Sequence, residues 1–289
     1  MWLALAFLSA LLLGFYDVSK KYSLRNNAVI PILFLNTLFC SLIFLPLAFR
    51  TPFGGWEVQR YILLKACIVL SSWLLGYIGI KNLPITIVGP INATRPVMVL
   101  VGALIIFGER LNLMQWAGVL LAILSFFLLS RSGKKEGIDF KHNRWILCTV
   151  GAAILGAISG LYDKYLMASE SGLGLPRLTV QCWYNFYQCI MMGAMLLLLW
   201  WPKRKESTPF KWRWNILLIS VFLSVADYVY FYSLSLDGAL ISVVSMVRRS
   251  SVLVSFLLGA LLFHEKNLRS KAIDLALVLL SMFLLWLGQ

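Results

Sequence analysis

Long apolar runs separated by short polar stretches extend along the whole chain. Most of these runs are close in length to the stretch of about 20 residues that an α-helix needs to cross a bilayer. Outer-membrane strands would instead alternate over about ten residues, whereas residues 119–129 and 275–287 are almost continuously apolar. The pattern therefore predicts an all-α polytopic membrane protein with ten transmembrane helices. The expected spans are residues 1–19, 28–49, 61–80, 84–107, 112–130, 145–167, 175–201, 213–235, 239–263 and 270–288.

The longest polar connection follows the fifth expected span and separates two groups of five. We therefore expect a first five-helix repeat at residues 1–130, a basic connecting loop at residues 131–144 and a second five-helix repeat at residues 145–289.

Matching motifs occur at equivalent places in the two halves. Residues 14–17 read Gly-Phe-Tyr-Asp, and residues 160–163 read Gly-Leu-Tyr-Asp. Residues 102–110 and 259–266 also match, each running from Gly-Ala-Leu to a glutamate and a basic residue. Because five spans separate equivalent positions, the halves enter the membrane in opposite orientations. Inverted repeats of this kind are typical of transporters with a substrate site near the bilayer midplane.

The paired glutamates Glu109 and Glu265 are each followed by a basic residue and a further apolar run. Together with the two five-helix repeats, they resemble the ten-helix EamA-type members of the drug/metabolite transporter superfamily. The resemblance covers essentially the whole chain and implies secondary transport, but it names no cargo. We expect the two glutamates to be structural or to stabilise a gate.

Composition excludes a soluble enzyme with one membrane anchor. Of the 289 residues, 60% are hydrophobic and 13% are charged, whereas soluble domains carry about 25% charged residues. The net charge is +14, but the basic residues lie in short clusters between apolar runs. Such clusters are typical of loops that face anionic headgroups, so we expect no nucleic-acid binding.

The orientation of the chain has two interpretations. Loops after odd-numbered spans carry most of the lysines and arginines, which by the positive-inside rule places those loops in the cytoplasm and both termini outside. The family resemblance instead implies cytoplasmic termini. We favour the charge bias.

Arg95 lies in the middle of the fourth expected span, between Pro90 and Pro96. A charge at this depth costs on the order of 3 kcal/mol or more, so it needs a partner or a water-filled cavity. Since the two prolines lack backbone donors, we expect a kink at which Asn92, Thr94 and Arg95 face a polar pocket. The guanidinium could then bind a carboxylate or phosphate of the substrate. The alternative is a permanent pair between Arg95 and an aspartate.

The ninth expected span contains Arg248 and Arg249. Adjacent helical residues point about 100° apart, so we expect one of them to face the pocket. Three arginines at membrane depth favour an anionic or zwitterionic cargo, unless all three are paired internally. Asp17, Asp163 and Asp227 are the available counter-ions, and they are also the candidates for proton coupling.

Aromatic and amide side chains supply further candidates. Residues four apart share a helix face, as do Trp73 and Tyr77, or Tyr184 and Gln188. We expect these four and Tyr228 to contact the organic part of a cargo, although packing alone would also account for them.

No catalytic or metal-binding motif occurs in the sequence, and its five cysteines are scattered. The sequence therefore predicts neither an enzyme nor a bound cofactor or metal, and it contains no ATP-binding motif. We expect a secondary transporter of the inner (plasma) membrane, as a monomer or homodimer. It would export or exchange a small anionic or zwitterionic metabolite, such as an amino acid, by alternating access. The rival interpretations are a flippase for a lipid-linked intermediate and a non-transporting membrane scaffold.

Overall fold

The computed structural model describes residues 2–51, 53–95, 97–98, 102, 112–134, 142–167, 173–235, 247–248, 250–263 and 268–287. Regular structure in these ranges is helical. The helices are α1 (Trp2–Leu24), α2 (Val29–Ala48), α3 (Gly55–Asn82), α4 (Ile85–Ala93), α6 (Leu113–Lys134), α7 (Arg144–Met167), α8 (Arg177–Met195) with its π-helical extension η1 (Leu196–Trp200), α9 (Asn215–Ser235), α11 (Ser251–Phe263) and α12 (Leu268–Leu287).

The helices confirm an all-α protein with several membrane spans. Within the described ranges, five helices are long and apolar enough to cross a bilayer, namely α1, α2, α3, α7 and α8. Helices α9 and α11 hold shorter apolar segments, and a further one lies in α6. Parts of the fourth and ninth expected spans lie outside the described residues, so the number of ten spans stays a prediction.

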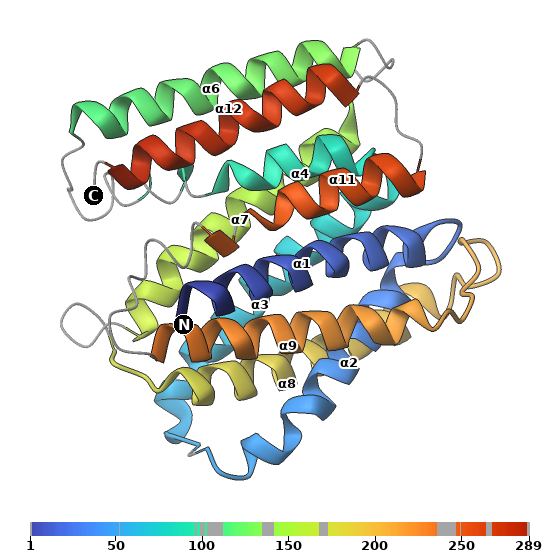
Figure 1. Ribbon diagram of the computed structural model, residues 1–289. Helices are drawn as coiled ribbons and strands as arrows, with labels where there is room; N and C mark the ends of the chain where they lie inside the picture. The colour runs from blue at the N-terminus through green and yellow to red at the C-terminus, as the bar shows by residue number, and fades with distance from the viewer. Residues whose placement is uncertain are drawn as a thin grey trace.

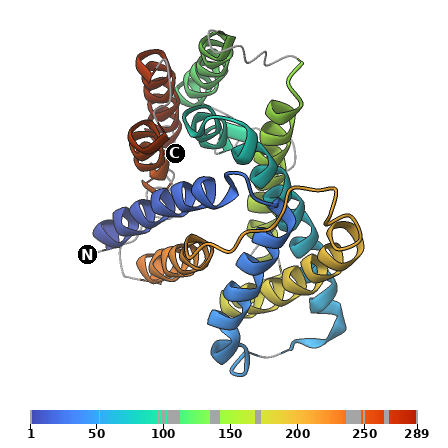
Figure 2. The same cartoon turned by 90° about the vertical axis from the view of Figure 1, so that its right-hand side faces the viewer.

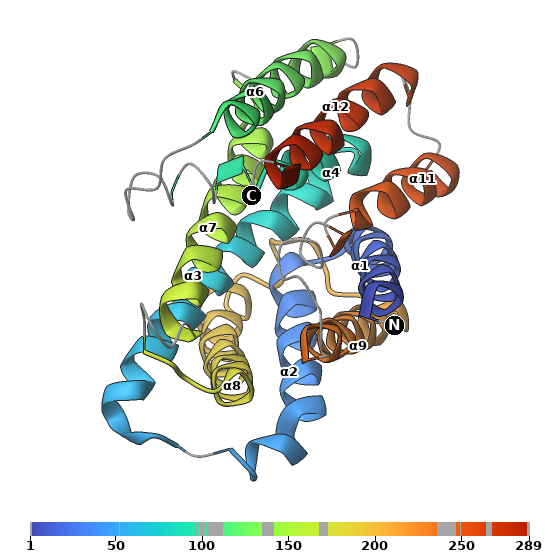
Figure 3. The same cartoon turned by 60° about the vertical axis from the view of Figure 1, so that its left-hand side comes forward.

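Helices from the two halves of the chain pack against each other reciprocally. Helix α1 packs along α9, and α3 packs along α7. Helices α2 and α8, α4 and α11, and α6 and α12 also pack against each other across the two halves. All three ribbon views place α6 and α12 side by side at one edge, far from α8 (Figures 1, 2 and 3). The first helix of each half, α1 or α7, thus packs on the third helix of the other half, α9 or α3. Two structurally related halves would produce this reciprocal arrangement.

Basic residues gather at one end of the bundle. Helix α1 begins and α12 ends at the left end in Figure 1, so this end holds both termini. The right end holds the α1–α2 turn, the α3–α4 corner and the α8–α9 loop at residues 201–214. These connections contain Arg25, Lys203 and Arg213. The charge asymmetry on which the orientation argument rests is therefore present in space, and the choice between the two orientations stays a prediction.

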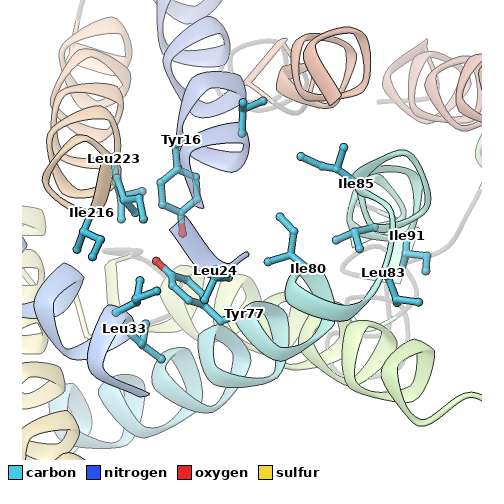
Figure 4. Packing of buried hydrophobic residues seen from close by; sticks show 14 of the residues in the cluster. Tyr16, Leu24, Leu33, Tyr77, Ile80, Leu83, Ile85, Ile91, Ile216 and Leu223 are labelled. Carbon is cyan, nitrogen blue, oxygen red and sulfur yellow. The ribbon is translucent and has the colours of Figure 1, made fainter. Parts of the chain in front are cut away.

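The buried core lies where α1, α2, α3 and α9 meet (Figure 4). Leu33 and Ile216 are fully buried there. Large apolar side chains such as Leu120, Leu198 and Leu261 are instead 62%, 75% and 70% exposed on the outside of the bundle. Apolar residues on the outer surface are what a bilayer requires, because lipid tails and not water cover them.

Candidate functional site

The fourth expected span is interrupted at Thr94. Helix α4 ends at Ala93, and the Thr94 backbone N–H donates to the Ile91 carbonyl at 3.2 Å in a tightened turn. The chain then resumes a helical course, since Val97 and Met98 both donate to the Thr94 carbonyl. An interruption inside an apolar span is the kink that the proline spacing predicted.

Arg95 lies at this interruption and has no carboxylate partner in the described part of the chain. Its Nη2 donates to Asn92 Oδ1 at 3.1 Å and, at 3.5 Å, to the Ala152 carbonyl of α7. Its Nε is buried without a hydrogen-bond partner. No carboxylate among the described residues contacts this positive charge directly, although Asp17 of α1 attracts it at longer range. A charge at membrane depth with so few direct partners is costly unless an anion or water completes its hydrogen bonds.

Gly156 of α7 provides the space that the Arg95 guanidinium occupies. A Cβ atom on Gly156 would lie 2.8 Å from both Cζ and Nη1 of Arg95. The absence of a side chain at this position thus lets the guanidinium lie flat against α7. The structure therefore places a cationic side chain directly against the backbone of α7 at this glycine.

Replacing Gly156 with alanine is therefore expected to displace the guanidinium and to weaken substrate binding about tenfold. The displaced group is the end of a flexible side chain, so the loss of stability should be small, about 1 kcal/mol or less. The measurement is the substrate Kd beside the melting temperature of the purified protein.

The matched control is Gly76→Ala in α3, where a new Cβ would lie 3.7 Å from Ala152 Cβ, an ordinary packing distance. Equal binding by Gly156→Ala and Gly76→Ala would show that the space beside Gly156 does not position Arg95.

Each of the three candidate aspartates forms an ion pair. Asp17 accepts from Lys20 Nζ at 2.8 Å within α1. Asp163 of α7 pairs with Lys65 of α3, and Asp227 of α9 pairs with Arg248. These contacts match the structural alternative, in which the aspartates brace the helices. A role in proton coupling stays a prediction.

Arg248 is consequently placed differently from Arg95. Besides Asp227, its guanidinium contacts the Tyr230 ring at 4.2 Å from the ring centroid. Arg248 thus has an acidic partner, and a role of either Arg248 or Arg249 in substrate binding stays a prediction. Its neighbour Arg249 lies outside the described residues.

Tyr16 and Tyr77 form an aromatic pair between α1 and α3. Their hydroxyl groups point toward one another in Figure 4, and Tyr77 is 1% exposed. The Lys20 ammonium lies 4.3 Å from the centroid of the Tyr16 ring and 5.4 Å from that of Tyr77. Tyr77 is thus part of a buried cationic and aromatic cluster, which could not be predicted from spacing within one helix.

A second group of candidates lines a narrow gap between α2, α3, α8 and α9. Trp73, Tyr184 and Asp227 face this gap, as do Gln181 and Asn185. In this conformation the gap has no room for a water molecule. The structure therefore brings two sequence candidates, Trp73 and Tyr184, to one place with Asp227.

Buried amides with unpaired groups occur at Asn185, which lines this gap, and at Gln188 and Asn36, each within four residues in sequence of a residue that lines it. Gln188 is 1% exposed and neither its Oε1 nor its Nε2 has a hydrogen-bond partner. The Nδ2 groups of Asn36 and Asn185 are also buried without a partner. Each buried polar group that stays unpaired costs about 1–3 kcal/mol of stability. These amides would therefore gain free energy by forming hydrogen bonds to water or to a solute.

Sequence analysis missed Asn36, Gln181 and Asn185. A signal was present for two of them, because Gln181, Asn185 and Gln188 lie four and three residues apart. That spacing puts three amide side chains on one face of α8. Nothing in the sequence indicated that Asn36 of α2 would lie at the same level.

Two candidates point away from these groups. Tyr228 is 62% exposed and shares an outer face of α9 with Val225 and Tyr232, which are 43% and 45% exposed. A helix turns about 100° between Asp227 and the next residue, so Tyr228 does not share the direction of Asp227, and its role as a substrate contact stays a prediction. The Thr94 hydroxyl donates to the Ile91 carbonyl at 2.7 Å.

Comparison with known proteins agrees with this architecture. Residues 1–131 and 143–287 match the profile of the EamA-like transporter family. An uncharacterized transporter of Archaeoglobus fulgidus is 28% identical over 134 residues, 44% of this chain and about half (47%) of the relative. A crystal structure described only as that of a protein has a TM-score of 0.64 at 13% identity, covering 98% of this chain and 95% of that one. It shows a shared fold. The chain therefore belongs to the EamA-like transporter family of the drug/metabolite transporter superfamily, and its apolar helices are those of a multi-pass membrane protein.

Proposed function

We propose that this protein is a secondary transporter that exports or exchanges a small organic anion or zwitterion across the inner membrane, with Arg95 as the anchor for the substrate carboxylate or phosphate. The observation that supports the proposal is the partly buried Arg95 guanidinium, which contacts neutral oxygens and no carboxylate in the described part of the chain.

Arg248, the other arginine at membrane depth in the described ranges, differs from Arg95 in its partners. Arg248 has the counter-ion Asp227, as expected for a structural charge. Arg95 has only the amide of Asn92 and a backbone carbonyl. A bound anion would supply the missing charge, and the planar guanidinium can donate two parallel hydrogen bonds to one carboxylate or phosphate.

The organic part of the substrate would occupy the gap beside Trp73 and Tyr184, where Asn185 and Gln188 offer unpaired amides. Because this gap is closed to water in the present conformation, the substrate can enter only after the helices separate. This favours alternating access between the repeats at residues 1–130 and 145–289.

Any energy for transport would come from an ion or substrate gradient. Asp17, Asp163 and Asp227 are the coupling candidates, and their side chains are 26%, 33% and 16% exposed. Asp163 is the first choice because it is the most accessible to water. Proton uptake there would weaken its pair with Lys65 of α3, and so loosen the contact between α3 and α7.

A thermal-shift screen of the purified protein tests the proposal. Carboxylates, amino acids and sugar phosphates are compared with quaternary amines at saturating concentration. A true ligand at 100 times its Kd stabilises by about 2.7 kcal/mol, which corresponds to a rise in Tm of about 5 °C or more. We expect such rises for one class of anion or zwitterion.

The substrate found in this way is then followed into proteoliposomes, where the wild-type protein should accumulate it. A response confined to quaternary amines would contradict an anionic group on the substrate. Binding without uptake would favour a scaffold, and movement of a lipid-linked compound alone would favour a flippase.

A further inference from the structure

An open cavity of about 440 Å³ lies at the basic end of the bundle. It is bounded by the end of α1, the corner between α3 and α4, and the end of α11. We call it the basic-end cavity. Its lining includes Lys21, Arg25, Lys81, Leu262 and Phe263. It differs from the gap beside Trp73 in residues, in size and in its access to water.

Among the residues that the structure describes, three cations line this cavity. The Lys21 ammonium donates to the Ile80 carbonyl at 2.6 Å and to the Leu83 carbonyl, so it is fixed at the C-terminal end of α3. The Lys81 ammonium has a hydroxyl partner, Thr208 Oγ1, at 3.4 Å, and Arg25 is exposed. Arg25 and Lys81 therefore place positive charge on one side of the cavity, where a bound anion would be attracted.

The other side of the cavity is apolar. Leu262 is 59% exposed at the end of α11, and Phe263 follows it. Because α1, α3 and α11 all end here, the cavity lies at the level where spans leave the hydrocarbon. A ligand that suits both sides carries a phosphate for the cations and an acyl chain for Leu262.

We propose that the basic-end cavity binds the phosphate of an anionic phospholipid, with Arg25 and Lys81 contacting the headgroup and Leu262 and Phe263 contacting an acyl chain. Basic pockets between membrane helices recognise anionic headgroups in this way. The proposal does not depend on the substrate or on Arg95. It implies that the lipid holds the α3–α4 corner against α11, beside the interrupted span.

The test compares retained and added lipid in wild-type protein and in the variant Arg25→Gln/Lys81→Gln. Lys21 is left unchanged because it caps α3. Native mass spectrometry counts bound phosphatidylglycerol after purification, and a titration of phosphatidylglycerol into detergent gives its Kd. Near the membrane surface each basic residue contributes about 1 kcal/mol to the attraction of anionic lipid, so the double variant should bind about 30-fold more weakly.

The matched control is Lys203→Gln/Lys205→Gln, which removes the same charge from the exposed α8–α9 loop at the same end. It should keep the wild-type Kd, and phosphatidylcholine should bind none of the variants specifically. Equal weakening by both double variants would overturn the proposal, because general charge would then explain binding. Tight binding of inorganic phosphate or glycerol phosphate, with no gain from the acyl chains, would also overturn it, and so would the absence of any bound lipid.

Discussion

Arg95→Gln is expected to lower the rate of substrate uptake into proteoliposomes by about a hundredfold at low substrate concentration. Two hydrogen bonds from a buried guanidinium to an anion contribute at least about 3 kcal/mol, and glutamine supplies neither the charge nor the planar fork. Uptake of the anion found in the thermal-shift screen is the measurement. Arg95→Lys keeps the charge without the fork and should retain intermediate activity.

The stability of Arg95→Gln separates a binding role from a structural one. Because Arg95 has no counter-ion among the described residues, removing its charge leaves no carboxylate unpaired. The melting temperature of the variant without substrate should equal or exceed that of the wild type. Strong destabilisation would instead show that Arg95 holds α4 to α7, and normal uptake would show that the substrate binds elsewhere.

Asp227→Asn is expected to destabilise the protein by about 3 kcal/mol or more. The change leaves Arg248 partly buried without its counter-ion, and removal of one partner of a buried pair costs about 3–5 kcal/mol. The side chains of Asp227 and Arg248 are 16% and 19% exposed, so water can replace only part of the lost interaction. Unfolding in sodium dodecyl sulfate, monitored by tryptophan fluorescence, gives the change in free energy.

The double variant Asp227→Asn/Arg248→Gln should recover most of this loss, because it removes both charges and leaves neither isolated. Recovery in the double variant would identify the pair as a brace between α9 and the segment at residues 247–248. Wild-type stability of Asp227→Asn alone would contradict the brace, and it would return Asp227 to the group of residues that titrate during transport.

The helical architecture could be predicted from the sequence because each membrane span requires a long apolar run. The same reasoning found the interruption at Arg95, since a charge and two prolines inside an apolar run allow few other structures. It also placed Trp73 and Tyr184 among the inward-facing residues. In each case the evidence lay within one helix.

Contacts between distant helices could not be read in this way. Asp163 pairs with Lys65, 98 residues earlier in the chain, and Asp227 pairs with Arg248, although any of the aspartates could have served Arg95. Tyrosine is a common residue type in binding sites, but the direction of the Tyr228 side chain follows from the rotation of α9 about its axis, which is set by packing. Gly156 accommodates a guanidinium, a role that depends on how α7 lies against the interrupted span.

Equilibrium binding of the transported anion by isothermal titration tests the central claim most directly. Wild-type protein should bind one anion per chain, and Arg95→Gln should show no measurable binding. The control Lys203→Gln/Lys205→Gln in the exposed α8–α9 loop should bind with close to the wild-type Kd. Unchanged binding by Arg95→Gln, or loss of binding confined to the Lys203 and Lys205 variant, would contradict the assignment of Arg95 as the anchor for the substrate.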